Sequence, residues 1–192
     1  EDAVFVHLFE KYVAQKNYPW LTEGGKKMIT DRAYSLMANL TGTPAADVEL
    51  PGPDGKTKTL YAIQAPYVLL AIWDPTCGHC KEVIPRIDSL HSARWQARGV
   101  ELFGMAKETE GNKDTWLAFI KDHQLARWTH VYYSKESEKA RVAAGIPSYS
   151  QLYDVQSFPT LYLLDKDKRI IAKKITEKQV DEILDYRQKG GK

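Results

Sequence analysis

The segment YVLLAIWDPTCGHCKEVIP, residues 67–85, contains both cysteines of the 192-residue chain, Cys77 and Cys80. Its first seven residues form a continuous apolar run, which suits a strand buried on both faces. The residues from Cys80 onward repeat apolar side chains at helical spacing, so the cysteines are expected where a buried strand ends and a helix begins. Unpaired backbone N–H groups at a helix start favour a thiolate. With two residues between the cysteines, one sulfur can reach the other, as a redox-active dithiol requires.

Three other uses of a cysteine pair compete with redox chemistry. A zinc site needs two further ligands, but the chain has no other cysteine, and the histidines considered show no paired spacing: His79, His91, His123 and His130. Attachment of c-type haem needs a histidine directly after the second cysteine, where this chain has Lys81. The third alternative is a pair of buried structural thiols. Gly78 counts against it, because a glycine between the cysteines indicates an exposed turn. We therefore expect no metal and favour redox chemistry.

Composition limits the classes of partner. The hydrophobic content of 43% can fill a sizeable core, so a folded domain is expected. The chain carries 27 Lys and Arg against 25 Asp and Glu, with no long block of like charge, so a nucleic-acid partner is not expected. No run approaches the ~18 apolar residues of a membrane-spanning helix. Because the chain opens at Glu1, we expect a processed or truncated piece, and anchoring of a longer parent protein stays open.

The first forty residues differ in pattern from the rest. Residues 4–16 and 24–40 carry apolar side chains at helical spacing and are separated by a break at Pro19. We interpret residues 1–40 as a helical appendage, or as the end of an upstream domain, whose apolar faces need a partner. Glycine and proline then punctuate short extended segments, and PDGK at 53–56 indicates a hairpin turn. The second domain is expected to cover residues 41–192.

From residue 66 onward, strand and helix patterns alternate. Strands are expected at 66–73, 100–106, 127–133, 160–165 and 169–175. Helices are expected at 80–96, 113–124, 135–145 and 177–189. This order predicts an α/β fold with a mixed central sheet flanked by helices.

Together these motifs resemble the thioredoxin superfamily, and especially its TlpA-like branch of thiol-disulfide oxidoreductases, which is related to the AhpC/TSA proteins. Three segments carry the resemblance: residues 41–60 for a leading hairpin, residues 67–85 for the active-site strand and helix, and DVQSFPTLYLLDKDKRI at 154–170 for a proline loop and strand pair. The resemblance covers the chain from about residue 41 to its end. It implies a thioredoxin-like fold.

The resemblance also implies roles for the CGHC residues. Cys77 corresponds to the exposed nucleophile and Cys80 to the buried thiol that resolves the mixed disulfide. Gly78 and His79 correspond to the variable dipeptide that tunes the reduction potential, since a histidinium would stabilise a nearby thiolate. An exposed turn residue without such a role is the alternative for His79.

Three residues are expected to contact substrate. Pro159 corresponds to the family's cis-proline, which lies against the dithiol and leaves the backbone before it, at Phe158, free to pair with an extended peptide. Trp73 matches an aromatic residue near the site, although a place in the core fits it equally well.

The chain departs from the family pattern at two positions. Ala71 stands where thioredoxins carry a buried aspartate that helps to move protons. Either another acid transfers the proton in this chain or no acid does. TlpA-like proteins often place a glutamate after the next strand, which makes Glu108 and Glu110 the candidates, with solvated loop charges as the alternative. Thr76 replaces the common tryptophan before the first cysteine, so the substrate-facing surface differs from the usual one.

These observations favour a thiol-disulfide oxidoreductase that reduces or exchanges disulfides in proteins outside the cytoplasm, in the bacterial periplasm. It would use the Cys77–Cys80 disulfide without any other cofactor. Its partners would be protein thiols or disulfides and an unidentified protein that recycles the pair. A thiol peroxidase of the peroxiredoxin type is one alternative, but Asp74 stands where that class has a threonine. A thioredoxin-like binding module is the other, and the intact cysteine pair counts against it.

Overall fold

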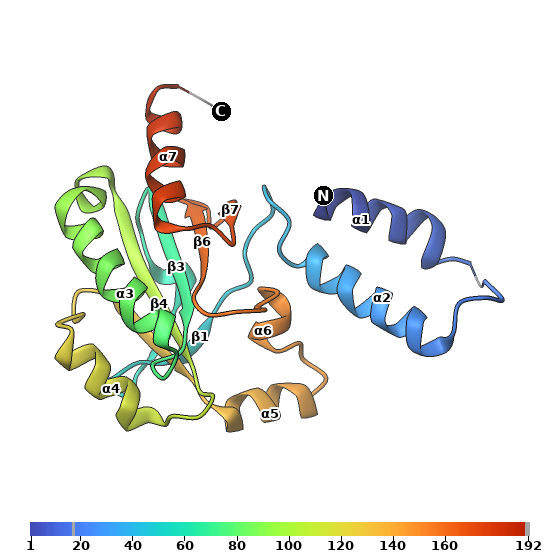
Figure 1. The fold of residues 1–192 in the computed structure, drawn as a ribbon, viewed down its shortest axis with the longest axis horizontal. Helices are drawn as coiled ribbons and strands as arrows, with labels where there is room; N and C mark the ends of the chain where they lie inside the picture. The colour runs from blue at the N-terminus through green and yellow to red at the C-terminus, as the bar shows by residue number, and fades with distance from the viewer. Residues whose placement is uncertain (17, 191–192) are drawn as a thin grey trace.

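A computed structural model of the chain describes residues 1–16 and 18–190, which form an α/β fold (Figure 1). The strands are β1 (Glu49–Pro51), β2 (Thr57–Thr59), β3 (Tyr67–Trp73), β4 (Val100–Lys107), β5 (Thr129–Tyr133), β6 (Thr160–Asp165) and β7 (Ile170–Lys173). The α-helices are α1 (Asp2–Leu8), α2 (Glu23–Met37), α3 (Gly78–Leu90), α4 (Lys113–Asp122), α5 (Lys135–Ala143), α6 (Tyr149–Leu152) and α7 (Glu177–Gln188). Short helical turns are η1 (Phe9–Val13), η2 (Leu60–Ala62), η3 (His91–Trp95) and η4 (Gln96–Arg98).

The central sheet has five strands in the order β5-β4-β3-β6-β7. Strand β4 runs parallel to β3 and β5, whereas β6 runs antiparallel to β3 and β7. The apolar run at 67–73 is the middle strand, as its sequence predicts, because only a strand covered on both faces can bury every side chain. The mixed sheet and its flanking helices confirm the expected thioredoxin-like fold.

The two faces of the sheet are covered differently. Leu69, Ala71 and Trp73 of β3 face the side that α3, α4 and α7 cover. The alternate residues of β3 face the β1–β2 hairpin and the tyrosines of and after α6, Tyr149 and Tyr153. The hairpin at PDGK was predicted, whereas α6 was not, because four residues are too few to show a helical period. Its capping box between Ser148 and Gln151 fixes it locally.

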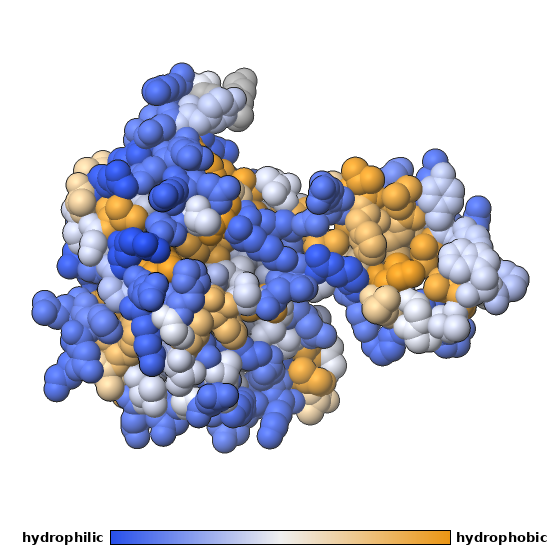
Figure 2. Space-filling view, in the orientation of Figure 1, coloured by the Kyte–Doolittle hydropathy of each residue, from blue (hydrophilic) through white to orange (hydrophobic). Residues whose placement is uncertain are grey.

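The N-terminal helices stand at one side of the sheet (Figure 1). They pack on each other through buried apolar side chains, and the rings of Phe9 and Tyr34 lie 6.0 Å apart. Their outer side is apolar and exposed, as the orange patch in Figure 2 shows; Val4, Trp20 and Met28 are more than half exposed. Among the helices of the described residues, none is long and apolar enough to cross a membrane.

A tight turn at Gly99 sets the start of the β3–β4 pairing. Gly99 has φ +74° and its carbonyl accepts a hydrogen bond of 3.1 Å from the backbone N–H of Tyr67. A Cβ atom at this position would lie 2.7 Å from Cγ of Pro66. Only glycine meets both demands, because the left-handed region disfavours other residues.

We therefore predict that Gly99→Ala lowers the free energy of unfolding by roughly 1–3 kcal/mol, the usual cost of a forced left-handed residue. Gly24→Ala is the matched control: a Cβ there meets nothing within 4 Å, and the helical backbone accepts alanine. The control should gain about 0.4–1 kcal/mol. Urea unfolding of both variants measures the difference, and equal stabilities would show that the turn is not constrained in this way.

Candidate active site

The two cysteines lie at the start of α3, at the end of the central strand. Cys77 is the residue before the first helical position, with extended backbone angles, and Cys80 lies in the first turn. The backbone N–H of Cys77 donates to the carbonyl of Asp74 at 3.2 Å, which closes the turn after β3. Cys77 is half-buried, and the two residues between the cysteines are exposed. Both cysteines are free thiols.

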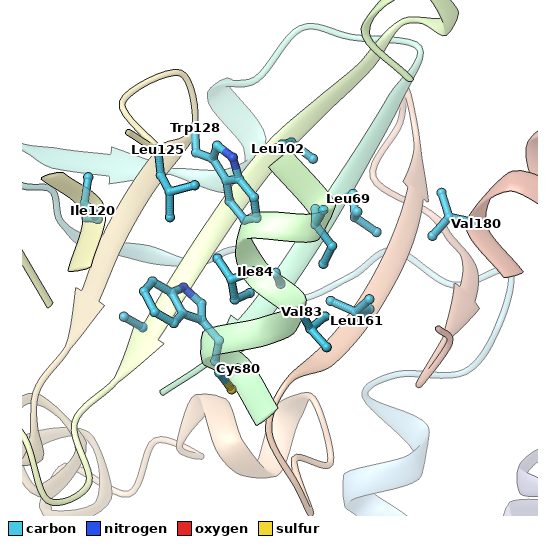
Figure 3. Close-up of a cluster of buried hydrophobic side chains, with 14 of the residues drawn as sticks. Leu69, Cys80, Val83, Ile84, Leu102, Ile120, Leu125, Trp128, Leu161 and Val180 are labelled. Carbon is cyan, nitrogen blue, oxygen red and sulfur yellow. The ribbon is translucent and has the colours of Figure 1, made fainter. Parts of the chain in front are cut away.

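Cys80 points into the apolar core on the α3 side of the sheet. Its side chain has no exposed surface, and Figure 3 shows it on α3 below Val83 and Ile84, at the end of the cluster. Burial raises the pKa of the Cys80 thiol, and the charge of Asp74 raises it further, while a hydrogen bond to the backbone at Asp74 acts in the opposite direction. Cys80 is therefore held as a neutral thiol that needs a proton acceptor before it can react.

The proline loop lies against the exposed cysteine. The peptide bond between Phe158 and Pro159 is cis, as the resemblance implied. The thiol of Cys77 donates to the carbonyl oxygen of Phe158, with a sulfur–oxygen distance of 3.7 Å, across 81 positions of sequence. Phe158 and Pro159 are half-buried, so part of each is accessible beside the sulfur.

A pocket of about 200 Å³ opens beside this contact. His79 of α3 and Pro159 of the proline loop form part of its wall, so the predicted tuning and substrate residues do come together. The remaining wall comes from the proline loop and the β7–α7 connection, and includes Gln156, Lys174 and Thr176. The pocket therefore joins three segments that are far apart in the sequence.

Asp74 is a buried acid in the turn before the cysteines, and the sequence analysis did not predict its burial. Only 5% of its surface is exposed. Its carboxylate accepts hydrogen bonds from the backbone N–H and the hydroxyl of Thr76, both at 2.7 Å, and from the hydroxyl of Thr109. Ala71, where thioredoxins have their buried acid, lies fully inside β3. The buried carboxylate at this turn thus comes from the loop after β3, and an acid between an apolar strand and a cysteine was the available signal.

The two glutamates predicted for proton transfer lie elsewhere. Glu108 is half-buried, and its backbone N–H donates to the carbonyl of Tyr133 at 2.9 Å, which extends the β4–β5 pairing. Burial and the nearby carboxylate of Glu108 raise the pKa of Tyr132. Glu110 is exposed. No hydrogen bond or ion pair found within the described residues joins either glutamate to Cys77 or Cys80, whereas the charge of Asp74 acts on the Cys80 thiol.

The structure also corrects the expected substrate contact of Trp73. This side chain has no exposed surface, and its ring lies 5.0 Å from that of Phe119 of α4. The cause is the alternation along β3, which turns Trp73 to the same face as Leu69 and Ala71. Trp73 is a core residue beneath the site, the alternative that its sequence position had left open.

Comparisons with known proteins agree with this geometry. The model of the AhpC/TSA family matches residues 41–173. The thiol-disulfide oxidoreductase ResA of Bacillus cereus is 26% identical over 137 residues, which are 71% of this chain and 70% of ResA.

Two solved structures extend the likeness. A domain of a possible thiol-disulfide isomerase from Cytophaga hutchinsonii has a TM-score of 0.66 and 29% identity, covering 78% of this chain and 94% of that one. A thioredoxin-like protein from Bacteroides caccae is 24% identical, with a TM-score of 0.68. The match covers 98% of this chain and 72% of the Bacteroides caccae chain. The second match therefore includes the N-terminal helices in its fold.

The raised pKa of Cys80 predicts how stability depends on pH. Below the ordinary thiol pKa of 9.0, Cys80 is protonated in both the folded and the unfolded chain. Above it, the unfolded chain loses the proton while the folded chain keeps it, so the free energy of unfolding falls. The slope approaches about 1.4 kcal/mol per pH unit. Tyrosines whose pKa is raised by burial add to this fall as the pH approaches their ordinary pKa of 10.0, so the contribution of Cys80 is the difference between the wild type and a variant without this thiol.

Denaturant unfolding of the reduced protein from pH 8 to pH 10, with a phosphine reductant present, measures this slope. Cys80→Ala should be less stable overall, and its free energy of unfolding should fall less steeply from pH 8 to pH 10 than that of the wild type, because the contribution of this thiol is missing. An identical slope in the variant would show that Cys80 is not the group responsible.

Proposed function

Since the chain belongs to the AhpC/TSA family, as a thioredoxin-like oxidoreductase of the TlpA-like kind, we propose that Cys77 and Cys80 are its redox pair and act on disulfides of other proteins outside the cytoplasm. The observation that carries this proposal is the contrast between the two thiols. Cys77 is partly accessible and lies beside the carbonyl of Phe158, whereas Cys80 is fully buried in the core. A nucleophile and a resolving thiol need this arrangement.

In the first step, the thiolate of Cys77 attacks one sulfur of a substrate disulfide. A bond forms between Cys77 and that sulfur, the substrate S–S bond breaks, and the second substrate sulfur leaves as a thiolate that takes up a proton. The start of α3 favours the attacking thiolate, because its free backbone N–H groups carry partial positive charge.

In the second step, Cys80 attacks Cys77 and releases the first substrate sulfur as a thiolate. Cys80 must lose its proton for this, and we assign Asp74 as the proton acceptor because it is a buried carboxylate whose charge acts on that thiol. The substrate gains two electrons and two protons, and the enzyme ends with a Cys77–Cys80 disulfide. A reduced dithiol partner then returns the enzyme to its starting state.

Substrate binding follows from the proline loop. Because proline has no N–H, the backbone around Phe158 offers hydrogen-bonding groups to an extended peptide whose disulfide meets Cys77. His79 lies exposed between the two cysteines and lines the adjoining pocket, so a histidinium there would stabilise the reduced form. Gly78 keeps this turn free of a side chain.

A peroxidase function is less well supported by the site. A peroxide bound at the cysteine needs a donor where peroxiredoxins have their threonine, whereas Asp74 offers a carboxylate that can only accept. A pure binding module would have no use for two thiols of such different burial. The relatives' names, which include a thiol-disulfide oxidoreductase and a possible isomerase, favour disulfide chemistry.

Reduction of insulin by the protein, with dithiothreitol as the electron source, tests the proposal. The wild type should accelerate the reaction, and Cys77→Ser should return it to the rate of dithiothreitol alone. Reduced Cys80→Ser, freed of dithiothreitol and mixed with a disulfide peptide, should instead accumulate a covalent mixed disulfide, seen as an added mass that later addition of a reductant removes. A parallel assay with hydrogen peroxide should give no turnover. Peroxide turnover without insulin reduction would overturn the proposal in favour of a peroxidase.

A further inference from the structure

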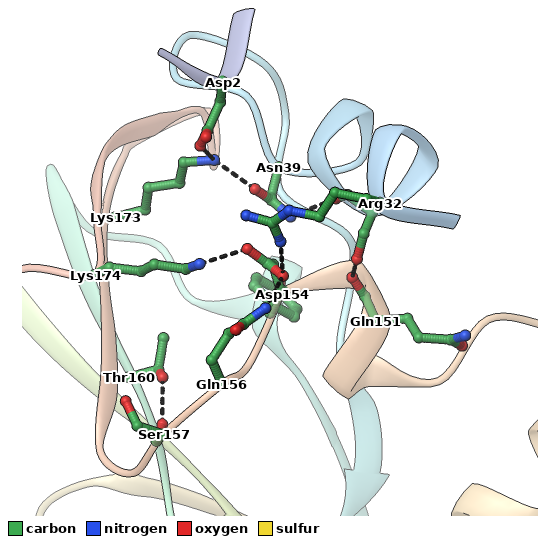
Figure 4. Close-up of polar contacts among 12 residues, drawn as sticks. Asp2, Arg32, Asn39, Gln151, Asp154, Gln156, Ser157, Thr160, Lys173 and Lys174 are labelled. Carbon is green, nitrogen blue, oxygen red and sulfur yellow. Dashed lines mark hydrogen bonds and ion pairs between the residues drawn. The ribbon is translucent and has the colours of Figure 1, made fainter. Parts of the chain in front are cut away.

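A buried carboxylate, Asp154, stands at the start of the proline loop. Only 4% of its surface is exposed, and its backbone adopts φ +44° between α6 and the loop. Figure 4 shows it between two cationic side chains, Arg32 of α2 and Lys174 after β7, which both donate to it. Gln156 donates a third hydrogen bond at 2.9 Å. Three segments of the chain thus meet at this one carboxylate: α2, the residue after β7 and the start of the proline loop.

The burial of Asp154 makes these contacts more consequential than an ion pair on the surface. An exposed pair changes stability little, whereas a buried charge that loses its partner is strongly unfavourable. Burial alone would raise the pKa of Asp154, but the hydrogen bonds from Lys174, Arg32 and Gln156 outweigh it and hold the pKa below the ordinary value. The carboxylate is therefore charged at neutral pH and depends on its donors.

Further contacts fix α2 to the same region. Ser35 donates to the carbonyl of Gln151 at 2.5 Å, and the side-chain amide of Asn39 donates to the carbonyl of Leu152 at 3.0 Å. These two carbonyls belong to α6, directly before the proline loop. Lys173 of β7 contacts Asn39 at 2.6 Å and Asp2 of α1 at 2.7 Å. The N-terminal helices are thus bound to the chain on both sides of Asp154.

The network reaches the pocket beside the dithiol. Gln156 and Lys174, the two other donors to Asp154, line the same pocket as His79 and Pro159. The contacts of this network include neither Cys77 nor Cys80. A change at Arg32 therefore reaches the wall of this pocket directly through Gln156 and Lys174, and it reaches Cys77 only indirectly, through the proline-loop backbone at Phe158.

We propose that the Arg32–Asp154 contact makes the N-terminal helices a positioning element for the proline loop, so that α2 sets the affinity for the substrate peptide. This inference rests on the proposed disulfide chemistry. Residues 1–40 are then part of the substrate-binding framework instead of an independent appendage, and Arg32 and Asp154 are positioning residues that act through Gln156 and Lys174.

Arg32→Met removes the cation and keeps most of the side-chain volume, whereas Arg32→Lys keeps the charge. Lys27→Met is the matched control on the same helix, because the Lys27 side chain is exposed and its ion pair with Asp31 lies within α2. Reduction of a disulfide peptide by each protein gives KM and kcat. Arg32→Met should raise KM between about twofold and thirtyfold, the range seen for residues that couple sites, with kcat nearly unchanged. Arg32→Lys should recover most of the loss.

Amide hydrogen exchange of residues 155–158 gives a second readout, and exchange there should accelerate in Arg32→Met but not in Lys27→Met. Asp154→Asn, which keeps the shape of the side chain, serves if Arg32→Met does not fold, and it should raise KM in the same direction. An unchanged KM in a folded Arg32→Met protein overturns the inference, whatever its exchange. A wild type that reduces no disulfide at all would instead overturn the proposed function.

Discussion

The fold places Cys77 at the edge of α3 and Cys80 one turn inside it, and the rest of the site depends on this difference. It follows from β3, whose seven residues occupy the middle of the sheet and end directly before the turn that carries the cysteines. Because α3 packs on the face formed by Leu69 and Ala71, the third residue of the helix must point into the core. Burial then holds the Cys80 thiol neutral, and exposure leaves Cys77 to react.

Two buried carboxylates tie the segments around the dithiol together. Asp74 joins the active-site turn to the loop after β4 through Thr109, and Asp154 joins the proline loop to α2 through Arg32. In each case, a side chain from a distant part of the sequence donates to a carboxylate, and this hydrogen bond offsets the cost of burying the acid. In our proposals, the same physical arrangement serves proton transfer at one side of the site and substrate positioning at the other.

The sequence predicted the elements that local patterns determine. The strand at 67–73, the helix that follows it, and the strand pair around the turn at 166–168 all match the structure, because apolar periodicity reflects which face is buried. Cys77 and Pro159 were placed together only through the family resemblance, since no local pattern joins residues so far apart.

What the sequence could not show depends on tertiary contacts. Distant segments contribute donors to the buried carboxylates, Thr109 to Asp74 and both Arg32 and Lys174 to Asp154, and Trp73 could not be assigned to the core before the covering helices were known. Glu108 and Glu110 were chosen by their place after a strand, and the structure shows that the strand pairing continues through the backbone of Glu108. The acid whose charge acts on Cys80 is Asp74, which lies three residues before Cys77.

The division between an accessible and a shielded thiol is tested most directly by alkylation. The fully reduced protein is treated at neutral pH with less iodoacetamide than protein, and the modified peptides are identified by mass spectrometry. The account predicts modification of Cys77, with Cys80 reacting only after denaturation. Equal labelling of the two cysteines in the folded protein, or preferential labelling of Cys80, would contradict it.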